Sequence, residues 1–220
     1  MDDAEKKIIT DIFKRYRGKY SARLGIRLDA GSPRQLFRWL LASMLYGAPV
    51  SSGTAERTYR EFMDSGLDTP RRLVDAGWDD LVRELDAGGY VRYDFKTADK
   101  LLEVSERLLR DYEGDLGLLH DMSEDSEDLK KRIMALGKGV GEVTANIFLR
   151  ELRGVWPKAK PALSPYALKA ARGLGLVKND EDPPVALVRA WGKGLPGKDF
   201  RDFEAALVQA GIEMRRKKAA

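Results

Sequence analysis

The chain has 220 residues, of which 43% are hydrophobic and 34% are charged, a composition typical of a soluble globular protein. It contains no cysteine, which excludes disulfides, thiolate zinc sites and cysteine-ligated iron–sulfur clusters. The 39 lysines and arginines against 35 acidic residues give a net charge of only +4, a weak indication of an anionic partner.

Positive charge is concentrated in the C-terminal third of the chain. Residues 150–172 hold six basic side chains against the single acid Glu151, and residues 215–218 are all basic. A solvated face is the plainer interpretation of each charge run taken alone. The N-terminus lacks the apolar core of a signal peptide, and no apolar run approaches the length of a membrane span, so we expect a cytoplasmic protein.

Apolar spacing predicts helices along nearly the whole chain. Large apolar residues recur at helical intervals in 36–45 and again in 101–109. Ser32 and Thr69 each place a capping hydroxyl directly before a proline, a residue suited to the first helical position. No segment alternates apolar and polar residues for long enough to support a sheet. The sequence therefore predicts an all-α fold of roughly ten helices.

A glycine-rich turn joins two of the predicted helices, 126–136 and 142–152. It reads Gly137-Lys138-Gly139-Val140-Gly141. Glycines allow positive φ and remove side chains, so backbone N–H groups here can approach a phosphate, which the dipole of the second helix also favours. Lys138 would add a positive charge, and Val140 would point inward and lock the helices together. An ordinary corner between helices is the alternative, but it accounts for only one or two of the glycines.

The turn and its surroundings resemble the helix–hairpin–helix (HhH-GPD) DNA glycosylase superfamily, and within it the endonuclease III-like branch. Residues 136–146 read L-G-K-G-V-G-E-V-T-A-N, where the family typically reads L-P-G-V-G-R-K-T-A-N. Weaker matches flank the turn: the helix after Ser32-Pro33, the segment 89–101, and residues 164–169. The resemblance covers roughly residues 21–175.

The resemblance implies two helical lobes that flank a DNA-binding cleft. Residues 33–146 would form a central bundle ending in the hairpin, and residues 1–32 with 147–220 would form the second lobe. It also implies a monomer, a damaged or distorted DNA duplex as partner, and association with the nucleoid. The four-cysteine cluster loop of many relatives is missing, so we expect no metal or other cofactor. Such proteins extrude a nucleotide, because the glycosidic bond cannot be attacked inside the base stack. The DNA-contacting residues that the resemblance implies are Gly137, Lys138, Gly139, Gly141, Thr144 and Lys169.

Three positions depart from the family's pattern where chemistry is concerned. Val143 stands where bifunctional members place the lysine that forms a Schiff base, so the lyase route is closed at this position. Ser164 stands at the position of the catalytic aspartate, and a neutral hydroxyl offers no full negative charge to a cationic transition state. Pro49 stands where relatives often carry a glutamine that fills the gap left by the flipped base, and it would act as an apolar wedge.

Other side chains could replace the missing groups. Glu142, at the start of the second hairpin helix, is the candidate for a catalytic carboxylate, and its alternative role is that of an exposed acid complementing the helix dipole. His120, the only histidine, is a weaker candidate for a general acid, because nothing near it in sequence is an obvious partner. Among the aromatic residues, Tyr46, Tyr90, Tyr93 and Trp39 are candidates for stacking on a flipped base, although helical spacing of aromatics is more typical of a core.

Two functions of different classes therefore stay open, with a third behind them. The first is a DNA repair enzyme, a monofunctional glycosylase that hydrolyses the N-glycosidic bond of a damaged base. The second is a catalytically inactive protein of the same fold that binds damaged or structured DNA. The third is a fold reused for protein–protein contact. The sequence favours DNA as the partner under the first two.

Overall fold

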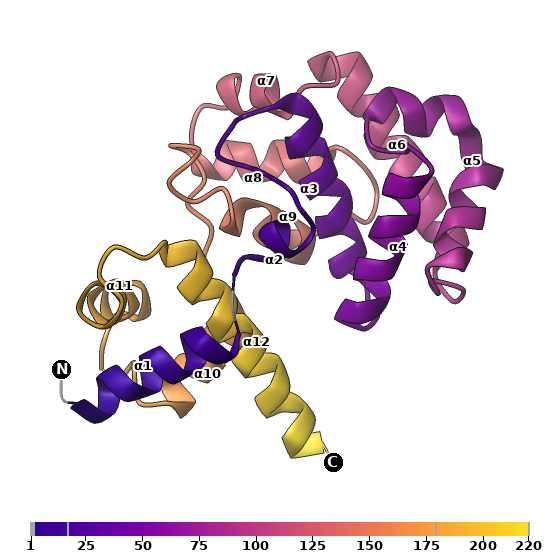
Figure 1. Cartoon of the computed structure of the whole chain (residues 1–220). Coiled ribbons are helices and arrows are strands. Elements are labelled where there is room, and N and C mark those ends of the chain that lie inside the picture. The colour runs from indigo at the N-terminus through magenta and orange to yellow at the C-terminus, as the bar shows by residue number, and fades with distance from the viewer. Residues whose placement is uncertain (1–2, 17, 179, 220) are drawn as a thin grey trace. The chain divides into compact units, whose positions relative to one another are not determined.

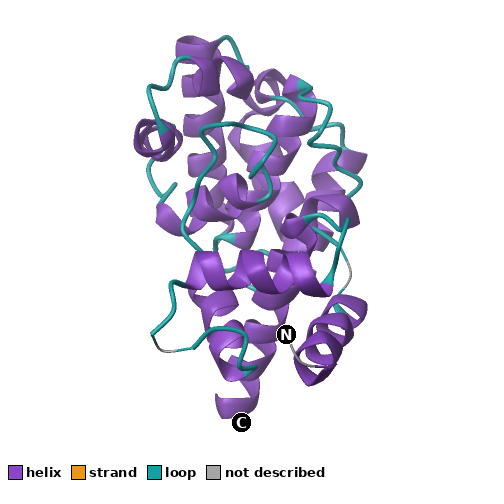
Figure 2. Ribbon diagram, turned by 90° about the vertical axis from the view of Figure 1, so that its left-hand side faces the viewer, coloured by secondary structure: helices purple, strands orange, loops and turns teal. Residues whose placement is uncertain are grey.

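The computed structural model describes residues 3–16, 18–178 and 180–219, and this part of the chain consists of helices and loops (Figure 1, Figure 2). The helices are α1 (Asp3–Arg15), α2 (Tyr20–Arg23), α3 (Pro33–Tyr46), α4 (Ser52–Asp64), α5 (Pro70–Ala87), α6 (Asp94–Tyr112), α7 (Leu116–Asp121), α8 (Ser126–Ala135), α9 (Glu142–Arg150), α10 (Pro165–Gly173), α11 (Pro183–Gly194) and α12 (Phe200–Ala219). The only strand-like pairing in these ranges is an isolated bridge between Arg153 and Trp156. The all-α prediction is confirmed, with twelve helices in these ranges against the roughly ten expected.

Contacts within the chain divide it into two compact units. One unit comprises Met1–Arg23 with Ala162–Ala220, and the other comprises Leu24–Pro161. We refer to the first as the terminal unit and to the second as the central unit. The central unit is longer at both ends than the bundle 33–146 expected from the family resemblance. It contains the whole hairpin, whereas Ser164 and Lys169 belong to the terminal unit.

Helix α3 is the central element of the central unit. Every residue from Leu36 to Leu45 except Arg38 is buried, so the helix is apolar on almost all sides, as a core helix must be. It contacts α4, α7 and α9. The indole Nε1–H of Trp39 donates a hydrogen bond of 2.9 Å to the backbone oxygen of Phe148 in α9, and this bond satisfies a donor that burial would otherwise leave unpaired.

The predicted helix starts are confirmed at α3 and α5, but the Ser32 hydroxyl makes no capping hydrogen bond. Pro33 and Pro70 occupy the first helical positions, and the Thr69 hydroxyl accepts the N–H of Arg72 at 3.3 Å. Helix α5 is interrupted at Gly77, whose φ of 78° and ψ of 178° are not helical. Helix α5 packs along α6, so that the two helices lie side by side.

The terminal unit depends on a close crossing of α10 and α12. A Cβ at Gly211 would lie 2.0 Å from the backbone oxygen of Tyr166, so only glycine allows the two backbones to approach this closely. Helix α1 packs against α11 and α12. Within the described ranges, no helix combines the length and the apolar character that crossing a bilayer requires.

Candidate nucleic-acid interface

The hairpin of the central unit is built by α8, the turn and α9. Val140 and Ala145 are 4% and 0% exposed, so the apolar plug and the close approach of the two helices expected from the sequence are both present. Gly139 has a φ of 90°, a left-handed conformation that favours glycine. The N–H of Val140 closes the turn by donating to the Gly137 oxygen at 3.1 Å.

Helix α6 supports the turn from beneath. A Cβ on Gly137 would lie 2.7 Å from Cγ2 of Val104, so this glycine lets the turn lie against the helix. The backbone N–H of Lys138 donates to Oε2 of Glu103 at 2.8 Å. A Cβ on Gly139 would lie 3.4 Å from Cδ of Lys100. Sequence reasoning missed the roles of Lys100 and Glu103, because nothing in their local pattern indicates that α6 carries the turn.

The outer face of the turn presents unoccupied donors. Lys138, Gly139 and Gly141 are exposed, and the N–H groups of Gly139 and Gly141 have no acceptor among the residues described. Gly141 is the N-cap of α9 and has no side chain to cap the first turn of that helix. The Lys138 ammonium likewise has no partner within the described ranges. Free N–H groups, a helix N-terminus and a lysine together form a surface suited to a phosphate.

Thr144 is turned toward the protein interior. Its side chain is 4% exposed and lies at the C-terminal end of α3, where a Cβ on Gly47 would be 2.4 Å from its Oγ1. A DNA contact at this position would therefore have to come from the backbone at the start of α9. Pro49, the candidate wedge, is exposed in the loop that follows Gly47.

Glu142 lies at the surface in an ion pair across the hairpin. Its Oε1 lies 2.7 Å from Nζ of Lys130 in α8, and its side chain is 74% exposed. The hydrogen bond from Lys130 holds the pKa of the Glu142 carboxyl below its ordinary value. A general acid needs the opposite shift, so this environment favours the alternative of a surface acid at a helix start. Val143 is 64% exposed beside it and brings no nucleophile.

Ser164 is a helix cap in the terminal unit. It is 8% exposed, and its Oγ accepts the N–H of Ala167 at 3.1 Å, at the start of α10. The hydroxyl therefore already has a structural partner. Lys169, one of the expected phosphate contacts, is exposed on the same helix.

His120 is part of a buried cluster in the central unit. Contrary to the expectation that no partner is near it in sequence, its Nδ1 lies 2.9 Å from Oδ1 of the adjacent Asp121, and its ring lies 4.7 Å from the ring of Trp156. Its Nε2 is buried without a hydrogen-bond partner among the described residues, so the nitrogen left to act on a substrate is enclosed. Of the stacking candidates, Trp39 and Tyr90 are 0% and 1% exposed and belong to the core, whereas Tyr46 and Tyr93 are partly exposed.

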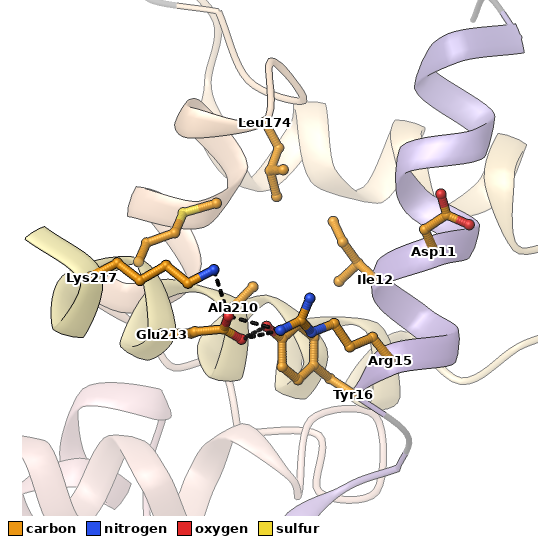
Figure 3. Close-up of a pocket in the computed structure, with 9 residues that line it drawn as sticks. Asp11, Ile12, Arg15, Tyr16, Leu174, Ala210, Glu213 and Lys217 are labelled. Atoms are coloured by element: carbon orange, nitrogen blue, oxygen red, sulfur yellow. Dashed lines mark hydrogen bonds and ion pairs between the residues drawn. The ribbon is translucent and has the colours of Figure 1, made fainter.

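A pocket of about 260 Å³ lies in the terminal unit (Figure 3). Ile12, Leu174, Ala210 and Met214 give it an apolar lining. At its edge, Glu213 receives hydrogen bonds from Arg15, at 2.8 and 2.9 Å, and from the Tyr16 hydroxyl. Lys217 also lies 3.0 Å from this carboxylate, so its charge is neutralised and we assign the pocket no role. In the described ranges, no group of three or more histidine or acidic side chains could hold a metal ion.

Comparison with known proteins relates the chain to one fold. No family model matches the sequence, and no curated protein matches it. Among solved structures, it is similar to the crystal structure of the H. pylori 3-methyladenine DNA glycosylase bound to 1,N6-ethenoadenine, with a TM-score of 0.56 and 12% identity. The likeness covers 97% of this chain and 98% of that one. The chain therefore has the all-α fold of the HhH-GPD DNA glycosylases.

Proposed function

We propose that this protein is a DNA repair protein that binds damaged or distorted duplex DNA through its hairpin. The observation that carries the proposal is the outer face of the turn, where the N–H groups of Gly139 and Gly141 and the ammonium of Lys138 have no partner in the described part of the chain. A phosphate bound there would receive backbone hydrogen bonds and the positive end of the α9 dipole. Such contacts position a duplex without reading its sequence.

The first candidate activity is excision of a damaged base by hydrolysis of its N-glycosidic bond. The fold supports it, because the similar H. pylori protein is a DNA glycosylase bound to a modified base. The exposed Val143 carries no amine, so the reaction would be hydrolysis without strand cleavage. The sequence pattern of the hairpin favours the endonuclease III-like branch, and within that assignment Glu142 and Ser164 are the catalytic positions and Pro49 the wedge.

Binding without hydrolysis is the second candidate function, and two observations favour it. The Glu142 carboxylate is exposed and paired with Lys130, and the Ser164 hydroxyl is committed to capping α10. Glu142 is therefore not arranged as a general acid, and neither residue offers an unpaired carboxylate to a sugar. A protein with these groups would hold a damaged site for other enzymes.

A strand-cleavage assay separates the two functions. End-labelled duplexes carrying uracil, thymine glycol, 8-oxoguanine, an alkylated purine or an abasic site are incubated with the protein and read with and without alkali. Breakage of a base-lesion duplex after alkali only identifies a monofunctional glycosylase. No breakage, with gel retardation intact on the same duplexes, identifies the binding protein. Breakage without alkali refutes the assignment of a hydrolase that lacks an amine nucleophile.

The hairpin contact has its own test. Lys138→Glu places a negative charge beside the phosphate site, and we expect weaker binding to every duplex and a salt slope reduced by about one unit. Lys7→Glu, an equal charge change on the exposed face of α1, is the control. Salt-dependent binding that Lys138→Glu leaves unchanged would contradict the phosphate assignment.

A further inference from the structure

Lys100 lies directly beneath the glycine turn. Its Cδ is the atom nearest to a Cβ built on Gly139, at 3.4 Å, and the ammonium is only two bonds further along the side chain. The stem is therefore packed against the residue of the turn whose φ of 90° disfavours any side chain. The charged end of Lys100 thus lies close to Gly139, whose N–H has no acceptor among the described residues.

The ammonium of Lys100 has no partner in the part of the chain that the structure describes. The acid nearest to it on the same face of α6 is Glu103, three residues on, and that carboxylate accepts the N–H of Lys138 at 2.8 Å. Lys96, one turn back, and Lys138, on the hairpin, are both cations. Burial is the only cause that lowers the pKa of Lys100, so no neighbouring charge compensates the loss of water.

We propose that Lys100 is a second cationic contact for the phosphate held at the hairpin, an inference that rests on the proposed DNA binding. Lys138 and Lys100 would approach the anion from the two sides of Gly139, one from the turn and one from α6. This arrangement lowers the desolvation cost of phosphate binding, because the Lys100 ammonium has already lost part of its hydration in the free protein. Glu103 acts as a positioning residue for the turn. Its carboxylate accepts the Lys138 N–H and does not pair with Lys100.

Three variants test the role of Lys100. Lys100→Met keeps an unbranched apolar stem over Gly139 and removes the charge, Lys100→Arg keeps the charge, and Lys7→Met removes a lysine from the exposed face of α1 as a matched control. Binding to a fluorescein-labelled duplex with a single abasic site is measured by anisotropy over a range of salt. We expect Lys100→Met to lose about tenfold in affinity at low salt and about one unit of salt slope, and Lys100→Arg and Lys7→Met to bind like the parent protein.

Thermal unfolding distinguishes binding from a structural role. Since Lys100 is a partly buried and unpaired cation, Lys100→Met should unfold at the same temperature as the parent or higher. A large loss of stability would make the residue structural and overturn the proposal. Unchanged affinity and salt slope in Lys100→Met, with Lys138→Glu still weakened, would overturn it and leave the proposed function intact. If the parent protein itself shows no salt-dependent binding, the proposed function is contradicted.

The pH profile provides a readout that packing alone would not change. A lysine whose pKa is lowered by burial loses its charge at a lower pH than an ordinary lysine does. Parent affinity should therefore fall as the pH rises into the range where Lys100 deprotonates, whereas Lys100→Arg, which stays charged, should show a flatter profile. Identical profiles for the two proteins would contradict the assignment.

Discussion

Gly47→Ala should show how tightly the hairpin is joined to the core helix. The backbone of Gly47 has φ −73° and ψ −13°, so alanine brings no backbone strain there. Its new Cβ would lie 2.4 Å from Oγ1 of Thr144 and 3.2 Å from the Ser43 oxygen. Overpacking of this kind costs about 1–3 kcal/mol, against about 0.4–1 kcal/mol gained by restricting the unfolded chain. We expect a net destabilisation of about 1–2 kcal/mol.

The contact with Thr144 can be isolated by a double-mutant cycle. Thr144→Ala removes Oγ1 and leaves its Cβ 3.5 Å from the new methyl group, an ordinary van der Waals distance. Gly47→Ala should therefore cost about 1–2 kcal/mol less in the Thr144→Ala background, a coupling within the range found for residues in contact. Thr144→Ser, which keeps the hydroxyl, is the matched background in which the cost should persist.

The assay is urea unfolding of the four proteins of each cycle, followed by circular dichroism at equal protein concentration. If the unfolding free energy falls with urea concentration at the same slope in all four proteins, the substitutions act on the native contact and not on the unfolded chain. Additivity of the two substitutions within about 0.5 kcal/mol would refute the reasoning, because it would mean that Gly47 and Thr144 do not share a contact.

Two further outcomes are expected. Gly139→Ala should cost about 1–3 kcal/mol in chemical unfolding, because its φ is 90°, whereas Gly141→Ala, with φ −94° and open space around its Cβ, should be tolerated. Burial raises the pKa of Asp199, but hydrogen bonds from Arg201 and Lys19 outweigh it and lower the pKa to about 2 from 3.8. Because the folded value is the lower one, the carboxylate should stabilise the protein above about pH 4 and lose this contribution as the pH falls toward 2. Asp199→Asn should lessen that loss in acid unfolding, and an unchanged acid profile would contradict it.

Local sequence signals were sufficient for the helices and the turn. The apolar residues of α3 and the hydroxyl–proline pairs before α3 and α5 depend on spacing and capping, which act over a few residues. The glycine turn was equally visible, because its pattern lies within a single short segment, 136–146.

Contacts made by tertiary packing could not be predicted in the same way. Glu103 and Lys138 are 35 residues apart, and no rule of local spacing pairs them. Glu142 was a candidate for catalysis in the sequence, and only the fold of the hairpin places Lys130 of α8 within 2.7 Å of it. The capping role of Ser164 was hidden by its alignment with a catalytic position, although serine before proline is a common helix start.

The hydrogen bond between Glu103 and Lys138 has a consequence for how this chain can diverge. The family pattern has proline directly before G-V-G, where this chain has Lys138, and proline has no N–H to offer. A descendant that acquired proline there would leave the Glu103 carboxylate facing the turn without its donor. It would also place uncompensated negative charge beside the proposed phosphate site. We therefore expect the two positions to vary together among descendants of this chain, with an acidic residue at 103 retained only where residue 138 keeps its N–H.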